Sequence, residues 1–169
     1  MSEPLAIYLH DHLGAANFAL ELLAKWRRDA KAPGFARWAG QLHDEIDADR
    51  DVLRQVIERI GEPSHSPKEA LGWIAEKISR YKLSHRRPLE FARFEGLEVL
   101  ALGILGKLSL WETLQLLTPH DARLAGCDYA KVEQRARDQH AEVERRRLEM
   151  GRAALLPRVP GRRRASRAL

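Results

Sequence analysis

The stretch from Leu89 to Leu117 constrains the fold of this chain more than any other. It holds about 29 residues without a proline, and its apolar side chains fall on every face of a helix. A helix that is apolar all round must be surrounded by other protein. It also lacks the ~20 nearly continuous apolar residues that a membrane span requires. The charged residues that interrupt it are Glu95, Glu98, Lys107 and Glu112. We therefore predict that this segment is the central helix of a bundle.

Three further long segments have the apolar periodicity of amphipathic helices. They predict helices from Pro4 to Asp29, from Phe35 to Ile60 and from Tyr129 to about Leu156. Between the second and the central helix, a capping-box pattern begins at Ser66, and we expect a shorter helix from Pro67 to about Leu83. A helix of that length can return the chain along the bundle, so the second and central helices would run parallel. The sequence thus predicts an all-α fold.

Arginines near the C-terminal end account for the net positive charge of the chain. The formal net charge is +5, and residues 157–169 contain five arginines and no acid. Setting those five aside leaves 24 of the 29 lysines and arginines, which equals the 24 aspartates and glutamates. A formally neutral body lacks the broad basic surface of nucleic-acid-binding domains, so nucleic acid is not an expected partner. We predict one domain over residues 1–156 and a disordered tail over residues 157–169.

The cysteine content and the N-terminal sequence predict a cytoplasmic protein. Cys127 is the only cysteine, which excludes an intrachain disulfide and fits a reducing compartment. The first residues lack a basic segment, and His10, Asp11 and His12 interrupt any apolar run. This N-terminus therefore differs from a secretory signal. No membrane partner is expected.

Each of the four long predicted helices carries metal-ligand residue types on its core-facing side. Helical periodicity predicts that these side chains point inward, and antiparallel folding about short turns brings them to similar heights. They are His12 on the first helix, Glu45 and Asp49 on the second, Glu95 and Glu98 on the central helix, and His140 and Glu144 on the last. Carboxylates and imidazoles that converge in a bundle core can bind a pair of iron or manganese ions.

These features resemble the ferritin-like superfamily, whose members have four long helices and a long crossover between the second and third. More closely, the chain resembles a group of uncharacterised bacterial ferritin-like proteins with a Tyr-Leu-x-Asp-His-Leu run on the first helix. That run is Tyr8, Leu9, Asp11, His12 and Leu13 here, and Asp138-Gln139-His140 on the last helix fits the same group. The resemblance covers about Tyr8 to Leu155. It implies a ferritin-like four-helix bundle with an extra short crossover helix between helices two and three, and it implies no particular reaction.

The chain departs from the Glu-x-x-His pairs that di-iron members of the superfamily carry. The second helix has Glu45-x-x-Ala48 and the last has Arg137-x-x-His140, while His12 stands where the first helix would carry a glutamate. Two functions fit these residues. One is a metal-binding protein with oxidase or storage chemistry on iron or manganese. The other is a metal-free bundle acting as a binding or scaffolding module, in which a buried polar network specifies packing. Whether the protein is an enzyme stays open at this stage.

In the metal-free alternative, basic side chains neutralise the acids of the core. Arg147 lies three residues after Glu144, a spacing that lets the two side chains pair on one helical face. Lys107 lies about 120° around the central helix from Glu95, at 3.6 residues per turn. We therefore predict that Lys107 is an exposed or interface charge whose aliphatic stem covers apolar surface.

The central helix is also apolar on faces that three neighbouring helices would not fully cover. Leu100, Leu110 and Leu114 are examples. We expect either that the predicted crossover helix covers them or that the protein forms a homodimer.

Overall fold

The computed structural model describes residues 4–61 and 88–156. Within those ranges the protein consists of helices without any strand, which confirms the all-α class. The helices are α1 (Pro4–Trp26), α2 (Pro33–Ile60), α4 (Leu89–Leu117), the short 3-10 helix η1 (Ala122–Leu124) and α5 (Tyr129–Leu155). The predicted crossover helix from Pro67 to Leu83 and the predicted tail lie outside the described residues.

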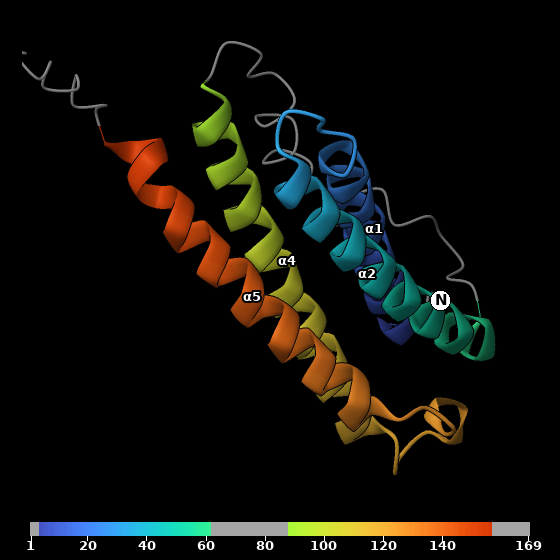
Figure 1. Cartoon of the computed structure of the whole chain (residues 1–169). Coiled ribbons are helices and arrows are strands. Elements are labelled where there is room, and N and C mark those ends of the chain that lie inside the picture. The colour runs from blue at the N-terminus through green and yellow to red at the C-terminus, as the bar shows by residue number, and fades with distance from the viewer. Residues whose placement is uncertain (1–3, 62–87, 157–169) are drawn as a thin grey trace, which may run out of the picture.

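The helices form two antiparallel hairpins. Helix α1 packs along α2, and α4 packs along α5, while α1 and α4 make the main contact between the hairpins (Figure 1). In Figure 1, α2 and α4 both run from the upper end of the bundle toward the lower end. They are therefore parallel, which agrees with the direction that the length of their connection predicts.

Local signals explain where the helices begin and end. Helix α1 ends at Trp26, earlier than the predicted Asp29, because the Asp29 carboxylate accepts the backbone N–H of Lys31 at 3.0 Å and forms a turn. Helix α2 begins at Pro33, whose ring suits the first turn of a helix. The side chain of Asp128 accepts the N–H of Lys131 at 3.1 Å and caps α5.

The central helix α4 has one buried face and one exposed face. Leu100, Leu110 and Leu114 are 2%, 1% and 0% exposed, so they are covered within a single chain. The exposed leucines of this helix are instead Leu102, Leu105 and Leu116. The 3.6-residue period explains the division, because it places these two sets of three on opposite sides of the helix. The homodimer stays a prediction. Nowhere in the described ranges is a helix long and apolar enough to cross a membrane.

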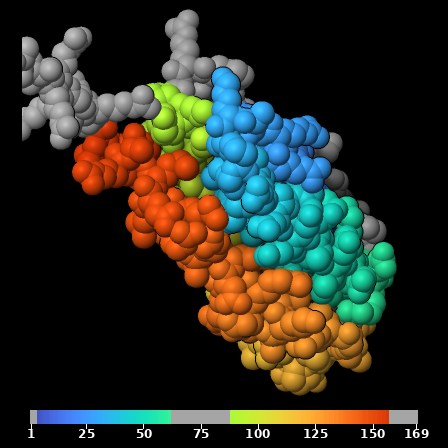
Figure 2. Space-filling view, viewed as in Figure 1, coloured from blue at the N-terminus to red at the C-terminus, as the bar shows by residue number. Residues whose placement is uncertain are grey.

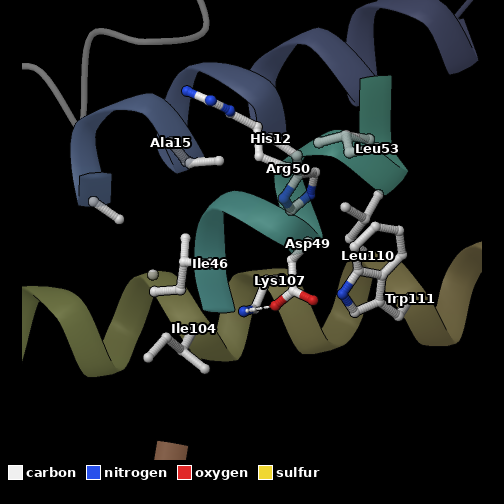
Figure 3. Close-up of a pocket in the computed structure, with 13 residues that line it drawn as sticks. His12, Ala15, Ile46, Asp49, Arg50, Leu53, Ile104, Lys107, Leu110 and Trp111 are labelled. Atoms are coloured by element: carbon white, nitrogen blue, oxygen red, sulfur yellow. Dashed lines mark hydrogen bonds and ion pairs between the residues drawn. The ribbon is translucent and has the colours of Figure 1, made fainter. Parts of the chain in front are cut away.

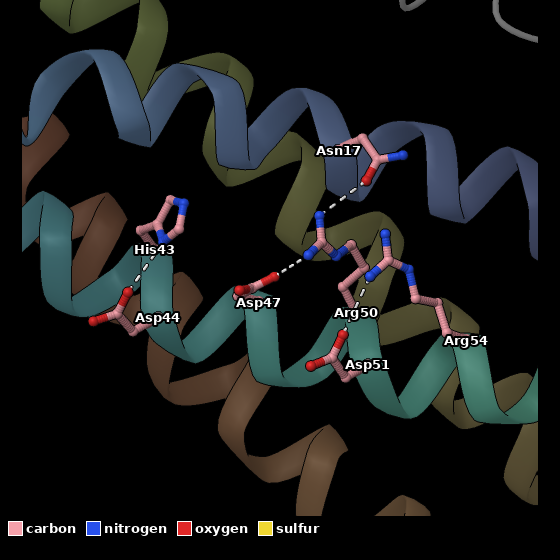
Figure 4. A network of polar contacts seen from close by, with 7 residues as sticks. All are labelled: Asn17, His43, Asp44, Asp47, Arg50, Asp51 and Arg54. Carbon is pink, nitrogen blue, oxygen red and sulfur yellow. Dashed lines mark hydrogen bonds and ion pairs between the residues drawn. The ribbon is translucent and has the colours of Figure 1, made fainter.

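The outward side of α2 carries a row of ion pairs (Figure 4). Arg50 pairs with Asp47 on its own helix and also donates to the side-chain oxygen of Asn17 on α1 at 3.3 Å. Arg54 pairs with Asp51 one turn further along. Exposed pairs of this kind contribute about 0–1 kcal/mol each, so they add little to the stability of the first hairpin.

Candidate functional site

Asp49 is the most deeply buried of the residues predicted to bind metal. Its side chain is 1% exposed, and two cations from two other helices face it. Lys107 of α4 donates from Nζ to Asp49 Oδ2 at 2.6 Å (Figure 3), and Arg135 of α5 forms an ion pair with Asp49 Oδ1. One carboxylate on α2 thus contacts basic side chains on α4 and α5.

Gln139 of α5 links this ion pair to a second carboxylate. Its amide oxygen accepts a hydrogen bond from Lys107, and its Nε2 donates to Glu45 Oε2 at 3.1 Å. The same Nε2 lies 3.4 Å from Asp49 Oδ2. We call Glu45, Asp49, Lys107, Arg135 and Gln139 the polar core cluster. Its two carboxylates and two cations give a formal charge of zero.

The position of Lys107 differs from the prediction of an exposed or interface charge. Its side chain is 13% exposed, and its ammonium group reaches into the polar core cluster. Burial lowers the pKa of Lys107, and the charge of the adjacent Asp49 opposes that shift. The sequence contained a signal for this position, because Ile104 and Trp111 lie three and four residues away and are both buried. The prediction for Lys107 was wrong because it measured the core-facing direction from Glu95, and Glu95 is only half-buried.

His12 lies between α1 and α4. Its ring contacts the edge of the Tyr8 ring at 4.7 Å between centroids. On the α4 side, its Cε1 lies 3.9 Å from the position that a Cβ would take at Gly106. Burial lowers the pKa of His12, so the imidazole is neutral at pH 7. The structure therefore surrounds His12 with an aromatic ring and a glycine backbone.

The acids near the C-terminal half of α5 are held by arginine. Arg147 donates two hydrogen bonds of 2.8 Å to the two oxygens of Glu144, which confirms the predicted pairing. These bonds, with smaller effects of the Arg147 and His140 charges, lower the pKa of Glu144. The exposed Glu98 of α4 also interacts electrostatically with Arg147.

The predicted ligand residues therefore occupy separate places. Glu45 and Asp49 meet at Gln139, Glu144 and Glu98 are near Arg147, and His12 lies at the contact of α1 with α4. Across residues 4–61 and 88–156, no three histidine, cysteine, aspartate or glutamate side chains gather closely enough to hold a metal ion. Sequence reasoning missed three members of the polar core cluster, which are Lys107, Arg135 and Gln139.

Two adjoining cavities lie where α4 meets α1. The larger has a volume of about 310 Å³ and is mostly apolar, with Phe18, Leu22 and Val99 in its wall. The smaller has a volume of about 40 Å³ and borders Asp49 and Trp111 (Figure 3). His12, Ala15, Ala19 and Gly103 line both. The indole N–H of Trp111 is buried without a hydrogen-bond partner.

A third, polar groove of about 510 Å³ lies between α2 and α5. Figure 2 shows the seam between these helices, with α2 in cyan to teal and α5 in orange. Trp38, Glu45 and Gln139 are among its lining residues. The guanidinium of Arg146 lies 4.5 Å from the centre of the Trp38 ring, a cation–π contact at the edge of the groove. The polar core cluster therefore reaches solvent on this side through Glu45.

Comparisons with models of protein families, with curated proteins and with solved structures found no match to this chain. Function is therefore inferred from the polar core cluster and the cavities beside it.

Proposed function

We propose that this protein is a metal-free helical bundle that acts as a binding module, in which the polar core cluster sets how the two hairpins pack. The same proposal includes a ferritin-like arrangement of the helices. It is supported by the parallel course of α2 and α4 and by the long connection between them. The observation that carries the metal-free part is the pairing of Asp49 with both Lys107 and Arg135.

The two basic side chains occupy the place that a metal ion would need beside Asp49. Two unit charges about 4 Å apart interact by roughly 4 kcal/mol near a protein surface, so a divalent cation there would be repelled by both. Arg135 cannot relieve this repulsion by losing a proton, because an arginine stays charged in proteins. The carboxylate is therefore stabilised by the chain itself.

The role that fits such a cluster is to specify packing. A buried ion pair often adds little net stability compared with apolar side chains of the same volume, because both charges must leave water. What it does impose is geometry, since a misplaced helix would leave a buried charge without its partner. Asp49, Lys107 and Arg135 come from α2, α4 and α5, so their contacts define the relative positions of three helices.

The binding role is supported by the larger cavity between α1 and α4. Its volume of about 310 Å³ lies at the lower end of the range for small-molecule sites. Its wall is mostly apolar with few polar groups, which is the composition of such sites. The cavity is separate from the Asp49–Lys107 contact, so a ligand there leaves the polar core cluster intact.

Metal analysis of protein purified without chelator or affinity metal tests this proposal. We expect far less than one ion of iron or manganese per chain, and no rise in thermal midpoint when Fe(II) or Mn(II) is added anaerobically. The same measurements on the Glu45→Ala and His140→Ala variants should give the same result. A stoichiometric ion that either substitution removes would instead support the iron or manganese site predicted from the sequence.

A further inference from the structure

We propose that the larger cavity between α1 and α4 binds a small apolar amine, with Asp11 as the counter-ion of its ammonium group. This inference rests on the binding role proposed above and names the ligand class. It draws on three observations, which are the space in the cavity, the position of Asp11 in its wall and the absence of a positive charge among its described lining residues.

The space exists because small residues face each other across the contact of the two hairpins. Ala15 and Ala19 of α1 line the cavity opposite Gly103 and Gly106 of α4. A Cβ at Gly103 would have no heavy atom within 4 Å, so the cavity extends directly from this backbone position. An apolar body placed there would remove apolar surface from water at about 25 cal/mol per Å².

Asp11 is the acidic residue among the described lining residues of this cavity. Its Oδ1 is buried and accepts no hydrogen bond, which is costly for a polar atom. Burial raises the pKa of Asp11, while the charge of the neighbouring His10 opposes that shift. A ligand ammonium group in the cavity would supply a compensating positive charge beside this carboxyl group.

The other titratable groups in the described lining carry no charge that competes with the ligand. They are Tyr8, which carries no cationic group, and His12, whose pKa is lowered by burial. The aromatic rings of Tyr8 and Phe18 add faces that attract a cation. A carboxylate head would be repelled by Asp11, and an alcohol would leave the Asp11 charge without a partner.

Isothermal titration calorimetry of the full chain at pH 7 tests this assignment with three probes of one length. These are octylamine, 1-octanol and octanoate, each below its micelle concentration. We expect octylamine to bind about tenfold more tightly than 1-octanol, which corresponds to about 1.4 kcal/mol, and octanoate to bind least. The Asp11→Asn variant should lose the preference for the amine and keep the binding of the alcohol. Asp44→Asn, at an exposed position of α2, is the matched control that keeps the preference.

The cavity itself is tested by filling it. The Gly103→Leu variant should abolish the binding of all probes, because its side chain grows into the open space. Gly34→Leu is the matched control: Gly34 is exposed in the first turn of α2, and a Cβ there also has no heavy atom within 4 Å. Circular dichroism of both variants checks that the helices remain.

The possible outcomes separate the ligand class from the binding role. Equal affinity for octylamine and 1-octanol, lost in Gly103→Leu, would overturn the amine assignment and leave the binding role standing. Amine binding that survives in Gly103→Leu would place it outside this cavity and overturn the site. If none of the three probes binds, both the site and the proposed binding role are overturned, while the metal analysis independently decides the metal-free part.

Discussion

Helix α4 meets its neighbours in two different ways. Toward α2 and α5 it extends Lys107, and large polar side chains satisfy one another around Asp49. Toward α1 it presents Gly103 and Gly106, and small side chains leave a cavity of about 310 Å³. The comparison shows that polar residues in a helical core need not form an open site. Here the charged side chains around Asp49 pair with one another, and the empty space lies instead beside Gly103 and Gly106.

The largest effect is expected at the closed contact. The Asp49→Asn substitution leaves the largely buried Lys107 and the partly exposed Arg135 beside each other without their anion, and breaking a buried pair costs about 3–5 kcal/mol. Urea denaturation of the variant and of the unmodified protein measures the change. Asp51→Asn on the same helix removes an exposed pair with Arg54 and should change stability by less than about 0.5 kcal/mol. Similar losses of stability in the two variants would mean that the buried pairs of Asp49 contribute no more than the exposed Asp51–Arg54 pair.

The open contact should tolerate added volume. Gly103→Ala gains about 1 kcal/mol of helix propensity, and its new Cβ meets no heavy atom within 4 Å. Gly151→Ala makes the same chemical change on α5, but its Cβ would lie 3.4 Å from a ring carbon of Phe94, so we expect a smaller gain. Thermal denaturation of both variants gives the ranking. A loss of stability at Gly103 would show that the space beside it is not empty.

A smaller effect is expected from pH at the border between the two contacts. Burial lowers the pKa of His12 in the folded protein below its ordinary value of 6.5. Between those two pKa values the unfolded chain binds a proton that the folded protein does not, so stability should fall as pH drops below 6.5. The His12→Gln variant should show a flatter dependence of unfolding free energy on pH in that range. An unchanged dependence would mean that His12 is not buried in its neutral form.

Much of this fold follows from periodicity and helix-end signals. The bounds of α4 agree with the segment from Leu89 to Leu117, and Asp128 caps α5 as its sequence predicts. The exposure of the leucines was harder to predict. The apolar residues of α4 fall on every face of the helix, so its own sequence does not show that Leu100 is buried while Leu102 is exposed. Only the direction of the neighbouring helices decides which face they cover.

The candidate site was less predictable than the fold. Periodicity placed Asp49 in the core, as observed, whereas Glu45, predicted on the same core-facing side, is exposed and contacts Gln139 at the edge of the bundle. It could not show that the partners would be Lys107 and Gln139, because long side chains reach across the bundle in directions that a helical wheel does not describe. The cavity was invisible for a different reason, since empty space between helices depends on tertiary packing.

The most direct test is a double-mutant cycle on Asp49 and Lys107. The free energy of unfolding is measured for Asp49→Asn, Lys107→Met, the double variant and the unmodified protein. If the two side chains balance each other in the core, the double variant loses less stability than the sum of the single losses, by at least about 1 kcal/mol. Additive losses would contradict a charge-balanced core at this contact.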